Sequence, residues 1–154
     1  MGMGEIITAI RDALRESNDL PYLRGSDVWI SPTVNYMPEQ VRTIGAGICP
    51  GPEARVEKVG GLFDVTRTVR VALFVSMMKI EAVVIGDAAN PGTTDITADV
   101  DAVLHDNFLG LPAIESAFCR TISEPVLFGN KAQAGRLLVR VIMDYQYASE
   151  EEAP

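Results

Sequence analysis

Histidine and cysteine are scarce: the 154 residues include one histidine, His105, and two cysteines, Cys49 and Cys119. The cysteines form no CxxC pair, so we expect two reduced, small apolar side chains, with a single disulfide left open as the alternative. His105 ends a predicted acidic helix, where the helix dipole and Asp101 one turn earlier give it an ordinary role. A catalytic histidine would need a nucleophile and an orienting partner, and we predict no catalytic residue, no metal site and no cofactor.

Long apolar runs and excess positive charge are also missing. No run of about 18 apolar residues and no basic start followed by an apolar segment is present, which argues against membrane insertion and secretion. Lys and Arg total 13 against 21 Asp and Glu, for a net charge of -8. This balance argues against general attraction to nucleic acid or anionic lipid. We therefore expect a chain made in the cytoplasm that binds neither membrane nor DNA specifically.

Three patterns resemble known binding motifs without matching them. GAGICPG at 45–51 has two glycines of a dinucleotide fingerprint, but prolines follow where a helix is needed. GNK at 129–131 lacks the remainder of a phosphate-binding loop, so a turn explains it. The aspartates of the segment 95–106 are scattered around a predicted helix, which favours a solvated acidic face over a metal site.

The strongest pattern in the chain is alternation of apolar and other residues along two long segments. TRTVRVALFVSMM at 66–78 and GRLLVRVIMDYQY at 135–147 both have the period of two expected of a strand with one buried face. Thirteen residues extend about 43 Å, whereas a compact chain of this length is about 38 Å across. We therefore expect strands that reach the edge of the domain, in a sheet whose ends meet another subunit.

The remaining segments predict a single domain over 1–154. Apolar spacings of three and four predict helices at 5–17 and from Thr94 or Asp95 to Asn107. Shorter strands are expected at 27–30, 41–48, 55–59 and 117–122. Because strands and helices do not alternate regularly, the fold class is α+β: a mainly antiparallel sheet with two long strands and two helices packed on one face.

Three segments are predicted to be irregular. Pro50 and Pro52 in CPGPEA each remove a backbone donor, so a loop is expected at 49–54. The segment IEAVVIGDAANPGTT at 80–94 is expected to be a long loop or projecting hairpin. Residues 149–154 are expected to form a frayed acidic tail.

Apolar clusters in or beside predicted loops are the candidate protein interface. They are Leu62, Phe63, Val83, Val84, Ile85, Leu127 and Phe128. The alternative is ordinary burial under the loops. A basic strip is the second candidate surface, formed by Arg67, Arg70, Arg136 and Arg140 if the long strands are adjacent. For these arginines we prefer the interpretation that charge at solvent-facing strand positions prevents unwanted pairing.

Four segments in this order resemble the tail terminator (tail-completion) proteins of long-tailed bacteriophages and related prophage particles. They are EIITAIRDALRES, VTRTVRVALFVSMM, DITADVDAVLHDN and RLLVRVIMDYQY. The resemblance implies an α+β subunit of a ring, expected to be hexameric, at the head-proximal end of the tail tube in the virion, assembled in the host cytoplasm. The ring would stop tube polymerisation and join the tail tube protein to the head connector or neck protein. No catalytic residue belongs to that role.

The acidic composition fits a ring through which DNA passes, because like charge keeps the polyanion from adhering to the channel wall. Two alternatives to a terminator stay open. One is another connector or neck protein on the head side. The other is a small ligand-binding α+β domain with a pocket between helix and sheet at Tyr145, Tyr147 or Cys119. An enzyme using His105 is a third, less favoured interpretation.

Overall fold

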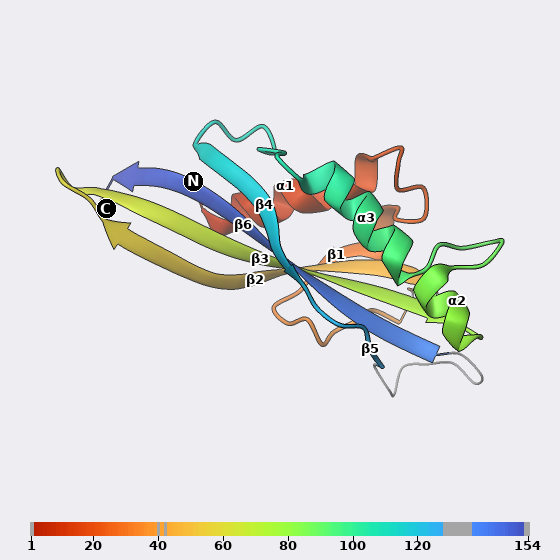
Figure 1. The fold of residues 1–154 in the computed structure, drawn as a ribbon. Helices are drawn as coiled ribbons and strands as arrows, with labels where there is room; N and C mark the ends of the chain where they lie inside the picture. Colours follow the sequence, from red (N-terminus) through yellow and green to blue (C-terminus); the bar gives the residue numbers. More distant parts are fainter. Residues whose placement is uncertain (1, 40, 42, 128–136, 153–154) are drawn as a thin grey trace.

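A twisted six-stranded sheet organises the chain, and a computed structural model describes residues 2–39, 41, 43–127 and 137–152 of it (Figure 1). The strand order is β1-β2-β3-β6-β4, β5 pairs beside β6, and only β1 and β2 are parallel. The strands are β1 (Val28–Ile30), β2 (Ile44–Glu57), β3 (Leu62–Met77), β4 (Ile114–Ile122), β5 (Val126–Leu127) and β6 (Leu137–Glu152). The helices are α1 (Met3–Glu16), a 3-10 turn η1 (Gly25–Asp27), α2 (Ile80–Ile85) and α3 (Thr93–Leu104). The predicted single-domain α+β fold with a mainly antiparallel sheet is confirmed.

The two predicted long strands are confirmed, and they are neighbours in the centre of the sheet. β3 and β6 each contain 16 residues and pair antiparallel from Leu62↔Glu152 to Met77↔Leu137 without a register shift. At about 3.3 Å per residue each strand is about 50 Å long. Because one face of each strand is apolar at every second position, a slip by one residue would expose the whole set, and this fixes the register.

The main core lies between the sheet and helices α1 and α3, which cover the same face (Figure 1). The helices contribute buried residues at spacings of three and four: Ile6, Ile7, Ile10 and Leu14 from α1, and Ile96, Val100 and Leu104 from α3. Alternate residues of β3, from Val69 to Met77, pack beneath them. The predicted helices and their buried faces are therefore confirmed.

The opposite face of the sheet is also partly covered, which differs from the expectation of one buried face per long strand. Ala72 and Phe74 of β3 form a second core cluster with Trp29, Met37, Val41 and Leu138. The Trp29 and Phe74 rings lie 5.8 Å apart. Alternation within β3 predicted that this face is open. It could not show the residues that cover it, because Trp29 comes from β1 and Met37 and Val41 come from the irregular segment after β1.

The loop predicted at CPGPEA is wrong, since β2 continues through it to Glu57. β1 pairs only with Ala46–Ile48, so beyond Ile48 the strand β2 is an edge of the sheet. An edge strand tolerates proline because the missing N–H has no neighbour to pair with. A register shift between Pro50 and Glu53 absorbs the remaining irregularity as a bulge.

Two further predictions of irregular structure are corrected. Residues Ile80–Ile85 form the short helix α2, which ends at Gly86 with φ +84°. Residues with an L side chain rarely adopt this positive-φ backbone conformation, and Gly86 therefore ends the helix. The acidic tail expected to fray from Ser149 is the end of β6 through Glu152, because β3 extends far enough to pair with it.

Candidate assembly surfaces

A three-stranded arm projects beyond the helices at one end of the molecule (Figure 1). We define the arm as residues 53–67 of β2 and β3 with 147–152 of β6. Its tip is a turn closed by a hydrogen bond from the Lys58 N–H to the Leu62 carbonyl, 2.7 Å, with Gly60 and Gly61 at φ +85° and +76°. β4 pairs with β6 only as far as Ser149, so the last residues of β6 form an outer edge. The arm is therefore supported mainly by its own three strands.

Arg67 ties the three strands of the arm together. Its side chain is 4% exposed; its Nε lies 2.6 Å from Glu53 Oε1 on β2, and its Nη1 and Nη2 lie 2.5 and 3.2 Å from the Glu151 carboxylate on β6. Its hydrogen bonds, with one from the Ser149 hydroxyl, lower the pKa of Glu151 to about 2. A paired, nearly buried arginine in this position joins β2 to β6 across β3.

The basic strip considered from the sequence does not form among the described residues. Arg67 points to the helix-covered side of the sheet, and Arg70 lies 3.5 Å from Asp144 on the adjacent strand. Arg140 donates to Asn35, 2.5 Å away, and Arg136 lies outside the described residues. The preferred interpretation, charge at a solvent-facing strand position, fits Arg70, whose side chain is 44% exposed. The buried role of Arg67 was missed because alternation alone does not reveal two carboxylates on neighbouring strands.

The arm is acidic and its tip is apolar. It holds more carboxylates than basic groups: Glu53, Glu57, Asp64, Glu150, Glu151 and Glu152 against Arg55, Lys58 and Arg67. Val59 at the tip is 97% exposed and Val56 is 64% exposed. Leu62 and Phe63, two of the predicted interface residues, lie beside this tip and are half-buried.

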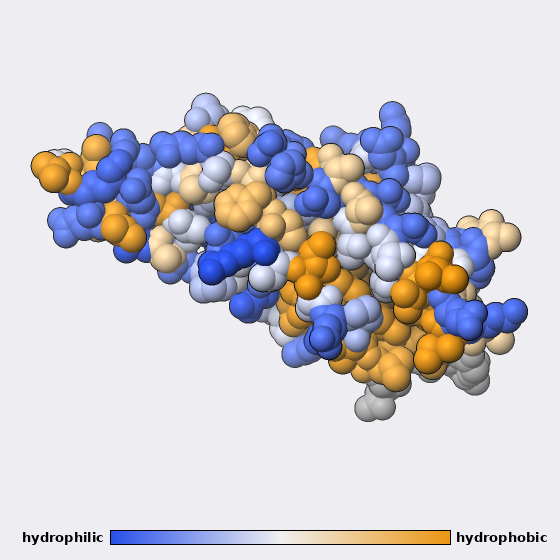
Figure 2. All heavy atoms as spheres, viewed as in Figure 1, coloured by the Kyte–Doolittle hydropathy of each residue, from blue (hydrophilic) through white to orange (hydrophobic). Residues whose placement is uncertain are grey.

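A second apolar surface lies at the opposite end, where Figure 2 shows hydrophobic atoms gathered around α2 and β5. We call it the α2–β5 surface. Its exposed members are Val84 38%, Ile85 67%, Ile122 53%, Val126 46% and Leu127 61%. The structure therefore places Val84, Ile85 and Leu127 at one end and Leu62 and Phe63 at the other. Val83 belongs to the core at 1% exposure, so ordinary burial applies there, and Phe128 lies outside the described residues.

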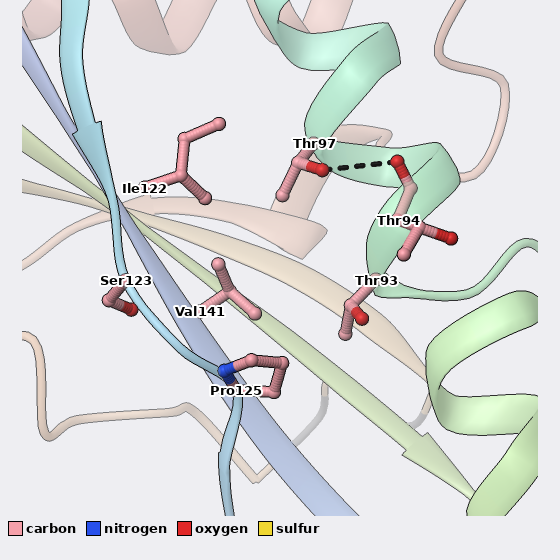
Figure 3. Close-up of a pocket in the computed structure, with 7 residues that line it drawn as sticks. All are labelled: Thr93, Thr94, Thr97, Ile122, Ser123, Pro125 and Val141. Carbon is pink, nitrogen blue, oxygen red and sulfur yellow. Dashed lines mark hydrogen bonds between the residues drawn. The ribbon is translucent and has the colours of Figure 1, made fainter.

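A recess of about 150 Å³ opens on the α2–β5 surface between the first turn of α3 and the chain that joins β4 to β5 (Figure 3). Its lining is Thr93, Thr94, Thr97, Ile122, Ser123, Pro125 and Val141. The Thr94 hydroxyl donates to the Val84 carbonyl, 2.8 Å, and so joins α3 to the end of α2. The recess could not be predicted from the sequence because its lining comes from three separate segments.

Two of the aspartates predicted to form a solvated face, Asp99 and Asp101, hold tyrosines, whereas Asp95 and Asp106 are exposed. The Tyr22 hydroxyl donates to Asp99 Oδ2 and the Tyr145 hydroxyl to Asp101 Oδ1, each at 2.7 Å. Burial, followed by these carboxylates, raises the pKa of both tyrosines. Asp99 therefore anchors α3 to the segment between α1 and η1, and Asp101 anchors α3 to β6.

The candidate chemical groups are placed as follows. Cys49 and Cys119 are both free, so the alternative of a disulfide between them is wrong. Burial raises the pKa of each thiol to about 11, which keeps both protonated at neutral pH. His105 is exposed, with its Nε2 3.4 Å from Asp106 Oδ2.

A second recess lies between α1 and Leu109. Neither it nor the recess beside α3 is lined by Tyr145, Tyr147 or Cys119, the residues predicted for a ligand pocket. Within the described ranges, no set of three or more His, Cys, Asp or Glu side chains is arranged to hold a metal ion. In the same part of the chain no helix combines the length and apolar character needed to cross a membrane.

Comparison with known proteins gives a likeness of fold. No family model and no curated protein matches the sequence. The structure is similar to a chain from the virion of a native gene transfer agent (GTA) particle, with a TM-score of 0.65 and 14% sequence identity over 96% of each chain. At this identity the similarity establishes a shared fold along nearly the full length of both chains.

Proposed function

We propose that this chain is a structural protein of a phage-like virion that forms a ring, expected to be hexameric, at the head-proximal end of a tail tube. The ring ends polymerisation of the tube and offers a surface to the head connector. One observation carries the proposal: the fold matches a chain of a gene transfer agent virion over 96% of both chains. The order of segments that resembles tail terminator proteins supports the position within the particle.

The shape of the subunit supports assembly into a ring. The arm and the α2–β5 surface lie at opposite ends of the long strands, and both expose apolar side chains. Surfaces at two different ends favour heterologous contacts, which close into a ring when the rotation between neighbours allows it. In this arrangement the arm contacts the adjacent subunit, and strand edges that would otherwise invite pairing are covered.

The charge of the chain supports passage of DNA through the ring without specific binding. The net charge is -8, and the arm alone carries six of the 21 acidic residues. A channel lined by such residues repels the phosphate backbone.

A capping experiment tests the proposal. Purified tail tubes, encoded in the same phage-like gene cluster as this chain, are incubated with the protein, and the tube ends are imaged by negative stain. Binding to one end, together with arrest of further tube growth, is expected. Binding to the head portal in place of the tube would identify the chain as a connector or neck protein, and failure to bind either would overturn the proposal.

A further inference from the structure

The tip of the arm differs in charge from the rest of the arm. Its segment RVEKVGG holds two basic residues, Arg55 and Lys58, against one acidic residue. Val59 follows Lys58 and is 97% exposed. A Cβ added to either glycine of the turn would meet no atom within 4 Å. The tip is therefore a narrow basic turn with one apolar side chain at its end, and its own subunit does not cover it (Figure 1).

The recess between α1 and Leu109 is lined by both small apolar and acidic side chains. Four lining residues share one face of α1 at spacings of three and four: Ala9, Asp12, Ala13 and Glu16. The recess has a volume of about 410 Å³. A cavity of about 150 Å³ already holds a benzene-sized molecule. The recess therefore has room for the narrow end of a hairpin and not only for one side chain.

The wall of the recess opposite α1 is held by the side chain of Asn107. Its amide nitrogen donates to the Val103 carbonyl, 3.0 Å, and its oxygen accepts from the Leu109 N–H, 2.9 Å. Leu109 has φ +59°, which is uncommon for a residue with an L side chain. Such a conformation persists where the surrounding contacts determine it. The recess is therefore preformed within one subunit.

Charge relates this recess to the arm tip. Within the described ranges Glu16 forms no ion pair, and Asp12 pairs only with its chain neighbour Arg11, 3.0 Å away. Arg55 and Lys58 pair only with carboxylates of their own arm, and all of these side chains are partly exposed. Exposed ion pairs contribute little, so the two cations can exchange partners. The recess beside α3 lacks this match, because no acidic residue lines it.

We infer that the arm tip of one subunit docks in the α1–Leu109 recess of a second copy of this chain. Val59 enters the recess, and the basic side chains of the tip lie beside Asp12 and Glu16. The inference rests on the proposed function, since it assigns one of the contacts between subunits of the ring. Tip and recess are different surfaces, so the contact is heterologous and every subunit repeats it. The α2–β5 surface is left free to contact the tail tube.

Disulfide trapping between two separately made full-length variants tests the contact. One variant carries Val59→Cys and the other Ala9→Cys, and they are mixed with glutathione disulfide. One variant is isotope-labelled, so mass identifies the mixed dimer, which reports contact between copies. The control replaces Ala9→Cys by Tyr36→Cys, an exposed position in the segment that covers the opposite face of the sheet. The recess variant is expected to give about tenfold more mixed dimer than this control, because docking raises the effective concentration of the two thiols.

Further variants define the site. Ala13→Cys supplies a second position in the recess, and circular dichroism checks that both recess variants fold. Ile85→Cys supplies the competing position, since it is exposed on the α2–β5 surface. The parent chain mixed with Val59→Cys controls for the native thiols of Cys49 and Cys119.

A charge reversal tests the electrostatic part of the contact. Glu16→Lys, added to the Ala9→Cys variant, is expected to lower the yield of mixed dimer about twofold to fivefold, the range for an exposed ion pair. Glu81→Lys on α2 makes the same change of charge away from the recess and should leave the yield unchanged.

Three outcomes would overturn the inference. They are mixed dimer no more abundant than with Tyr36→Cys, both alone and with tail tubes, a preference for Ile85→Cys, and equal effects of Glu16→Lys and Glu81→Lys. Failure of the proposed function looks different. Rings and tube capping without the mixed dimer would refute this contact alone, whereas mixed dimer without tube capping would support the contact and overturn the role at the tail end.

Discussion

At the scale of single residues, Arg67 joins three strands of the sheet, and the Tyr145–Asp101 hydrogen bond joins the sheet to α3. Arg67 is almost fully buried between two carboxylates, so removal of a partner leaves a guanidinium without its full compensation. Tyr145 and Tyr147 are neighbours on β6 with the same buried orientation, and the hydroxyl of Tyr147 has no partner among the described residues. These contrasts supply matched pairs of variants.

Glu151→Gln is expected to lower the free energy of unfolding by about 1 to 2 kcal/mol at pH 7, since a partly exposed pair is screened by solvent. The folded pKa of about 2 lies below the ordinary value of 4.5. The stabilisation is therefore present above pH 4.5 and lost as the pH falls towards 2. Urea denaturation at pH 7 and pH 3 measures the difference, with Glu152→Gln as the exposed control. An equal cost of Glu151→Gln at both pH values would contradict the role of this ion pair.

Tyr145→Phe is expected to destabilise the protein by about 1 kcal/mol, because Asp101 loses the hydrogen bond it accepts at 2.7 Å. Tyr147→Phe is expected to be neutral or slightly stabilising, because it removes a buried hydroxyl without a partner. Thermal unfolding of the two variants in parallel checks the prediction. A larger loss for Tyr147→Phe than for Tyr145→Phe would refute it.

At the scale of elements, the sequence predicted those with strong periodicity and failed where neighbours decide the structure. The helices of residues 5–17 and 94–107 and the two long strands were identified because one face of each is apolar. β2 was cut short at Pro50, since only the sheet order shows that this part is an edge. Of the predicted interface, Val83 could not be told from Val84 without knowing which side of α2 faces the core.

The junction of α2 and α3 depends on a glycine. A Cβ at Gly92 would lie 2.4 Å from the Val84 carbonyl oxygen and from the Gly86 nitrogen, both backbone atoms that cannot move independently. Gly92→Ala is therefore expected to cost about 2 kcal/mol or more and to shift amide signals of α2. Gly4→Ala, on α1 with no atom near the added Cβ, should stabilise by about 0.5 to 1 kcal/mol. Denaturant unfolding compares the two, and a neutral Gly92→Ala would show that α2 is not held in this way.

At the scale of the whole molecule, the arm and the α2–β5 surface lie at opposite ends of the long strands (Figure 1). Both ends expose apolar side chains, as expected of surfaces that are covered in an assembly. The sequence pattern predicted strands that reach the edge of the domain. It did not predict that the exposed apolar side chains lie at two opposite ends, because their location depends on where β2, β3 and β6 begin and end.

The α2–β5 surface is expected to contribute to assembly on the tail. Val84→Asp and Leu127→Asp place a charge on this surface and should weaken tube capping by tenfold or more while circular dichroism is unchanged. Thr8→Asp adds the same charge on exposed α1 as a control. Full capping by both surface variants would remove this surface from the account.

The most direct test of the ring is the native mass over a range of concentrations, with negative-stain imaging of the assembled species. Six copies of 16.7 kDa give about 100 kDa, and rings of that mass with a central hole are the predicted result. A monomer at every concentration, both alone and with tail tubes, would contradict the account.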